Sequence, residues 1–218
     1  MTAVEDLVYG ENEVIEGETY AHWMQEWWRW ILKIPIESNP SNDRTGEFSN
    51  QFQDADVYFL GGGVTGPAAN KWRLEKDTVT REINVPRGKP VLVPAAVGIV
   101  SIAEFPDLFD DKTLGNAYTM DRYKAEVTFL QGKIDGLVIE KEGFVYQVTP
   151  VFNVKYGENN IFDVHATENT PAVSEGFWLC LKPRNEDFNV QFSQRTEANQ
   201  ELNYHAFEYE VNCKIHLT

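Results

Sequence analysis

Few residues of this chain have the types and spacing that catalysis or metal binding requires. Its four histidines show no i, i+2 or i, i+4 spacing suited to a zinc site. No Gly-x-Ser-x-Gly motif occurs, and Cys180 and Cys213 have neither metal-binding nor redox spacing. The sequence therefore offers no candidate nucleophile and predicts no cofactor, apart from one weak calcium candidate.

That candidate is an acidic stretch containing Glu104, Asp107, Asp110 and Asp111. Carboxylate oxygens are the ligands that calcium prefers, but the spacing is not that of an EF-hand. The competing interpretation is a solvated acidic loop. Because two suitably placed carboxylates suffice for glycoside chemistry, and the chain has 34 acidic residues, a hydrolase or lyase acting on a carbohydrate stays open.

Aromatic residues form the second group with binding potential. Four of the six tryptophans lie within residues 19–35, and Trp28 is at the rim of the apolar arc there. Trp178 is on the strand phase opposite Phe177, and Trp72 lies in a loop region. These rings predict either a platform for a sugar or an apolar partner, or ordinary core packing.

Arg81 is the only polar member of an otherwise apolar strand phase, whose other members are Val79, Ile83 and Val85. A guanidinium keeps its proton, so a buried one needs a carboxylate or several carbonyl oxygens around it. The expected partners are Asp43, Glu47 or Glu26. Three interpretations stay open: a structural ion pair between helix and sheet, an edge position in water, or a site for an anionic ligand group.

Residues 19–35 must form the helix that positions the tryptophans, because their apolar side chains recur at three- and four-residue steps. Thr19 is the expected N-cap and Pro35 the expected end. The apolar arc spans about 200°, calculated at about 100° per residue. Either a second layer covers this helix or an aromatic edge remains open.

Most of the remaining chain is patterned as strands, with the clearest alternation in residues 188–192 and 207–217. Short strands, regular turns and one strong helix predict a mainly β fold, a β-sandwich or jelly roll with the Trp-rich helix packed on it. We expect residues 1–218 to form one domain, with an acidic lead-in at 1–18. Residues 103–119 fit no strand and are expected to form a projecting loop.

Composition narrows the range of partners. The 218-residue chain has a formal net charge of −15, which argues against nucleic acid and against anionic membrane surfaces. No run of about 18 apolar residues occurs, and the opening residues lack a secretory pattern, so we expect a soluble, cytoplasmic product. The two cysteines are expected to remain reduced.

Several motifs resemble those of an uncharacterised group of bacterial proteins. They are Thr19-Tyr20 with Trp23, Trp27-Trp28 and Trp30, then Ile34-Pro35, Asn39-Pro40, Asp43 to Gly46, Val57 to Gly62, Arg81 to Lys89, Ile134 to Gly136, Gly176 to Trp178 and Lys182-Pro183. The resemblance covers nearly the whole chain and implies a helix followed by a β-sandwich, but no activity. Many relatives look exported and carry cysteines where this chain has Ser49, Asn50, Glu82 and Asn84.

The sequence favours a non-catalytic β-sandwich that binds a glycan, a small apolar ligand or a protein partner, or that serves as a structural subunit. Trp28, Asp43, Arg81 and Trp178 are the candidate binding residues. The alternative is the carboxylate-dependent hydrolase or lyase.

Overall fold

Two mixed β-sheets form most of the computed structural model, which describes residues 3–63, 77–117, 122–166, 168–197 and 206–218. The first sheet has the order β1-β3-β8-β6, with β7 also paired to β8: β1 Tyr58–Phe59, β3 Val91–Ser101, β8 Thr170–Leu181, β6 Val145–Val148 and β7 Phe152–Val154. The second sheet has the order β2-β10-β9-β4-β5: β2 Asp77–Val85, β10 Phe207–Leu217, β9 Phe188–Thr196, β4 Val127–Ile134 and β5 Leu137–Glu140. The pairs β1–β3 and β2–β10 are parallel, and the other pairs are antiparallel.

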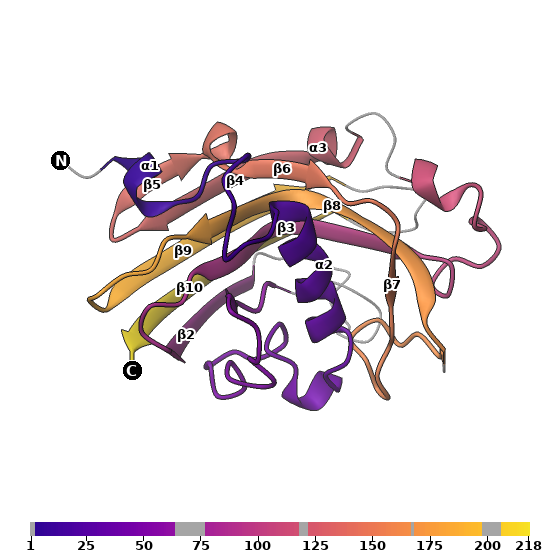
Figure 1. Ribbon diagram of the computed structural model, residues 1–218, viewed down its shortest axis with the longest axis horizontal. Helices are drawn as coiled ribbons and strands as arrows, with labels where there is room; N and C mark the ends of the chain where they lie inside the picture. The colour runs from indigo at the N-terminus through magenta and orange to yellow at the C-terminus, as the bar shows by residue number, and fades with distance from the viewer. Residues whose placement is uncertain (1–2, 64–76, 118–121, 167, 198–205) are drawn as a thin grey trace.

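The two sheets pack face to face, and the helix lies on the far side of the first sheet (Figure 1). Strand β8 shows how this arises, because over residues 177–181 both of its side-chain phases are apolar and buried. Phe177, Leu179 and Leu181 pack against the second sheet, while Trp178 and Cys180 pack on the helix side. The expected mainly β sandwich with one packed Trp-rich helix is confirmed.

Helix α2 (Tyr20–Ile31) begins as expected, with the Thr19 hydroxyl accepting a hydrogen bond from the His22 amide at 3.2 Å. It ends at Ile31 rather than at Pro35. The side-chain amide of Asn39 donates to the carbonyls of Ile31 (2.8 Å) and Ile34 (3.0 Å). In a longer helix these carbonyls would accept from backbone amides of the next turn. Here the Asn39 side chain takes that place, and the helix ends four residues before the proline.

The four tryptophans of α2 are all enclosed, with exposed fractions of 6% or less. Each indole N–H reaches an acceptor from a different segment, at 2.6–2.8 Å: Trp23 to the Ile15 carbonyl, Trp27 to the Leu60 carbonyl, Trp28 to the Ser174 hydroxyl and Trp30 to the Gln51 carbonyl. The wide apolar arc is therefore covered by a second layer, built from the first sheet and the segments around it.

The remaining helical elements are short: α1 Val4–Leu7, α3 Arg122–Glu126, and the 3-10 turns η1 Ile36–Ser38, η2 Leu114–Asn116 and η3 Lys141–Gly143. The acidic lead-in follows the end of β8, since the Tyr9 amide bonds to the Cys180 carbonyl and the Lys182 amide bonds to the Leu7 carbonyl. None of the helices in the described ranges is long and apolar enough to cross a membrane.

The thiols of Cys180 and Cys213 are free and buried on opposite sides of the first sheet. Cys180 lies in the helix-side cluster, and Cys213 lies in the core between the sheets. Their separation by a sheet is consistent with the expected reduced state.

Candidate functional site

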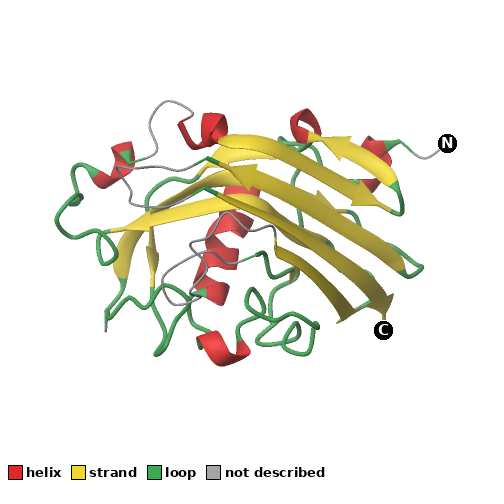
Figure 2. Ribbon diagram, turned by 180° about the vertical axis from the view of Figure 1, so that it is seen from behind, coloured by secondary structure: helices red, strands yellow, loops and turns green. Residues whose placement is uncertain are grey.

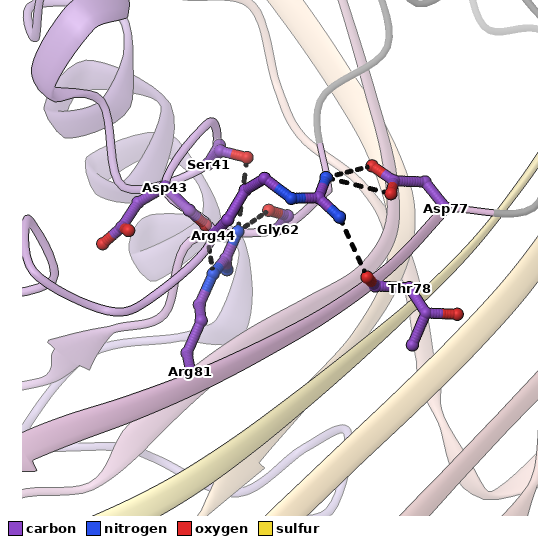
Figure 3. A network of polar contacts seen from close by, with 7 residues as sticks. All are labelled: Ser41, Asp43, Arg44, Gly62, Asp77, Thr78 and Arg81. Carbon is purple, nitrogen blue, oxygen red and sulfur yellow. Dashed lines mark hydrogen bonds and ion pairs between the residues drawn. The ribbon is translucent and has the colours of Figure 1, made fainter.

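The four binding residues expected from the sequence lie in two separate places. Trp28 and Trp178 belong to the layer between α2 and the first sheet. Asp43 and Arg81 meet where residues 39–46 pack on β2, the edge strand of the second sheet (Figure 3).

The expected aromatic platform does not form from Trp28 and Trp178, whose exposed fractions are 3% and 0%. Both rings pack edge-on against Trp27, with centroid distances of 4.8 Å for Trp28 and 5.5 Å for Trp178. The rim of the arc is closed by Phe162, 6.2 Å from the Trp28 ring. Neither ring presents a face to solvent, so both serve as core. Trp72, the third expected member, lies outside the described residues.

Asp43 organises the turn that follows the helix. One carboxylate oxygen accepts hydrogen bonds from the Thr45 and Gly46 amides at 2.8 and 3.0 Å, and the other accepts from the Phe48 amide at 2.8 Å. Burial alone would raise the pKa of Asp43, but these amide donors outweigh it and lower the pKa below its ordinary value. Both carboxylate oxygens of Asp43 are therefore occupied by backbone hydrogen bonds within the turn.

Arg81 is buried, with an exposed fraction of 2%, and donates to four backbone carbonyl oxygens. Its Nε donates to Asp43 at 2.7 Å, and the remaining bonds join Nη1 to Gly61 (2.5 Å) and Nη2 to Ser41 (3.3 Å) and Gly62 (3.2 Å). Asp43 thus contributes its carbonyl, not the expected carboxylate. Burial lowers the pKa of Arg81, against the opposing influence of Cys213 and Asp43.

The other expected carboxylate partners of Arg81 are engaged elsewhere or exposed. Glu26 pairs with Arg29 within the helix at 2.5 Å, and Glu47 is exposed. Arg44 forms an outer pair beside Arg81, its Nη1 lying 2.9 Å from both carboxylate oxygens of Asp77, and it also donates to the Thr78 carbonyl (Figure 3). Together the two arginines fasten residues 41–44 and 61–62 to β2. This geometry is that of a structural tie.

The expected calcium ligands are not brought together. Asp107, Asp110 and Asp111 are exposed, and Asp110 accepts hydrogen bonds from Lys112 and Thr113. Glu104 is half-buried instead, with its Oε2 shielded from solvent. Among the residues that the structure describes, no group of three or more His, Cys, Asp or Glu side chains could hold a metal ion.

Sequence reasoning missed the outer face of the second sheet, which no element of the described ranges covers. Figure 2 shows these strands on the side opposite α2. Two rows of side chains cross all five strands in register: Thr80–Asn212–Gln191–Lys133–Val138 and Thr78–Glu210–Ser193–Gln131–Glu140. We call them the central rows. All ten residues are partly or fully exposed, and six carry neutral hydroxyl or amide groups. Alternation predicted polar residues outside, but not their alignment across strands distant in sequence.

Comparison with known proteins adds no assignment. No protein-family model matches the chain, and no curated protein is similar to it.

Proposed function

We propose that this protein is a non-catalytic binding protein that recognises a neutral oligosaccharide on the outer face of its second sheet. The observation that carries the proposal is the composition of the central rows. Three amides (Asn212, Gln191 and Gln131) and three hydroxyls (Thr78, Thr80 and Ser193) lie on neighbouring strands. Amide and hydroxyl groups both donate and accept hydrogen bonds, as sugar hydroxyls do.

The charge distribution supports a neutral ligand. With a formal net charge of −15, the chain as a whole disfavours anionic partners. Within the central rows the charged side chains are Glu210, Lys133 and Glu140, of mixed sign. The row beside them pairs its own charges across strands, with Lys214 3.9 Å from Glu82. The charges in and beside the central rows therefore produce no strong electrostatic field of one sign at the proposed site.

The enclosure of Trp28 and Trp178 removes the aromatic platform considered for either a sugar or an apolar partner. A sugar site on the central rows therefore depends on the hydrogen bonds of their amide and hydroxyl groups. The carboxylate-dependent hydrolase or lyase remains the alternative function, with no observation in its favour. Asp43, whose carboxylate would be a candidate, is held by three backbone amides.

A screen against immobilised neutral oligosaccharides tests the proposal. The sugar retained is then titrated against the wild type and against Gln191→Ala/Asn212→Ala. Loss of one or two hydrogen bonds should weaken binding about tenfold, the equivalent of about 1.4 kcal/mol. Asn153→Ala, an exposed asparagine on β7 of the first sheet, is the matched control and should bind as wild type.

Two results contradict the proposal. The first is a screen that retains no neutral sugar, or retains one whose affinity is unchanged in the double variant. The second is the appearance of new reducing ends or unsaturated products when the retained sugar is incubated with the protein, which would favour the hydrolase or lyase.

A further inference from the structure

Phe129 is an exposed aromatic residue on the outer face of the second sheet. Its side chain is 45% exposed, although it belongs to β4, which lies between β9 and β5 in the sheet. It shares the outward phase of Gln131 and Lys133, two residues of the central rows. The outer face therefore presents a phenyl ring beside its amide and hydroxyl groups.

A β-bulge separates Phe129 from its apolar neighbour on the same strand. Regular alternation would place Val127 and Phe129 on one face of β4. The register shifts between them, because two steps along β4 correspond to one step along β9, from Thr196 to Arg195. Val127 enters the core with an exposed fraction of 0%, whereas Phe129 stays outside. Bulges of this kind re-aim side chains and are over-represented beside functional sites.

Two polar side chains of the central rows flank the Phe129 ring. Gln131 follows two residues later on β4 and pairs with Ser193 of β9, which is thus the diagonal neighbour of Phe129. Diagonal neighbours in a sheet are about 7–8 Å apart, within reach of an aromatic side chain. The Gln131 Nε2 donates to Glu140 at 3.3 Å, which leaves the Gln131 Oε1 to accept from a ligand. The Ser193 hydroxyl can both donate and accept.

A pyranose ring with equatorial hydroxyls has the shape and chemistry that match this arrangement. Its two faces carry C–H groups, and its hydroxyls project outward near the plane of the ring. The negatively polarised face of a phenyl ring attracts C–H groups, and covering it removes apolar surface from water. The amide and the hydroxyl beside the ring are then placed to bind the outward hydroxyls. An axial hydroxyl on the stacked face would hold the two rings apart.

We propose that Phe129 stacks on a pyranose unit of a β-linked oligosaccharide with equatorial hydroxyls, while Gln131 and Ser193 bind the hydroxyls of that unit. This inference rests on the proposed function and names the class of sugar that the outer face takes. An extended chain suits rows that cross five strands, over about 19 Å at about 4.8 Å between neighbouring strands.

Calorimetric titration with cellotetraose, a β-1,4-linked glucose tetramer, tests the inference. Phe129→Ala should weaken binding about fivefold, because the sugar no longer covers the exposed half of a phenyl ring. Phe129→Leu should also weaken binding, since it keeps an apolar side chain but loses the aromatic face, whereas Phe129→Tyr should bind as wild type. Phe52→Ala is the matched control, because it removes a phenylalanine that is 66% exposed and lies outside the second sheet.

Proton NMR of cellotetraose bound to the wild type gives an answer even if Phe129→Ala fails to fold. The C–H protons of one glucose unit should shift upfield through the ring current of Phe129. The absence of this shift in bound cellotetraose would overturn the stacking.

The remaining outcomes separate this inference from the proposed function. If Gln191→Ala/Asn212→Ala weakens cellotetraose binding and Phe129→Ala does not, the role of Phe129 is wrong and the binding face stands. A screen that retains other neutral oligosaccharides but not cellotetraose would overturn the class of sugar alone. A screen that retains no neutral sugar would overturn both proposals.

Discussion

Arg81 is buried without a carboxylate in direct contact. Its guanidinium has five N–H donors, and four backbone carbonyls accept from it. All four acceptors, Ser41, Asp43, Gly61 and Gly62, belong to segments with little regular structure. The Arg81 side chain therefore donates hydrogen bonds to backbone carbonyl groups of these loops that are buried away from solvent. A neighbouring strand supplies such donors at the edge of a strand.

Replacing Arg81 by methionine should cost at least about 3 kcal/mol of unfolding free energy, because four buried carbonyls lose their donor at once. Chemical denaturation measures this loss. Arg44→Met is the matched control: the Arg44 side chain is 54% exposed and its pair with Asp77 should contribute less than about 1 kcal/mol. A structural tie is the wrong interpretation if both variants are equally stable.

The sequence predicted the inward position of Arg81 because strand alternation is a local property. It named Asp43 as a partner but not the carbonyls of Ser41, Gly61 and Gly62, since these depend on where residues 39–46 and 61–62 pack. The same limit applies to Trp28. The sequence predicted the position of Trp28 at the rim of the apolar arc. It did not predict the Phe162 ring and the Ser174 hydroxyl that enclose this side chain, because they lie more than 130 positions away in the sequence.

Helix α2 is an enclosed structural element, fastened by its indole groups to four different segments. Trp27→Ala and Trp28→Ala should each cost about 3 to 5 kcal/mol, as large core deletions do, and should differ by less than about 1 kcal/mol. Denaturation of the two variants measures this. Phe52→Ala, at a ring that is 66% exposed, should cost less than about 1 kcal/mol. A much smaller loss for Trp28→Ala would show that the helix edge is open after all.

The two thiols should be unreactive in the folded protein, because burial raises both pKa values, that of Cys213 to about 11. A thiol reagent should label neither cysteine at pH 7.5 and both in guanidinium chloride. Labelling of a folded, monodisperse sample would contradict their burial. A denatured sample that yields labelled protein only after reduction would reveal a disulfide.

Strand and helix positions were predictable where patterns are local and strong. The final strand, Phe207–Leu217, and the start of α2 agree with the sequence analysis. The end of α2 was not predictable, because the Asn39 side chain that bonds its last carbonyls returns from a later turn.

For the whole molecule, the layer order decides which surfaces remain for function. The first sheet is covered on one side by α2 and on the other by the second sheet, so among the described residues the outer face of the second sheet is the broad sheet surface without a covering layer (Figures 1 and 2). Of the binding residues expected from the sequence, Trp28 and Trp178 lie inside these layers, and Asp43 and Arg81 are buried where residues 39–46 pack on β2. The central rows were not foreseen because they join strands whose pairing the sequence does not reveal.

Mapping of backbone amide shifts during titration with a retained neutral oligosaccharide tests this account most directly. The account predicts saturable shifts centred on β9 and β10, around Gln191 and Asn212, with α2 and residues 39–46 unchanged. Shifts concentrated in α2 or around Arg81, with the central rows unaffected, would contradict it.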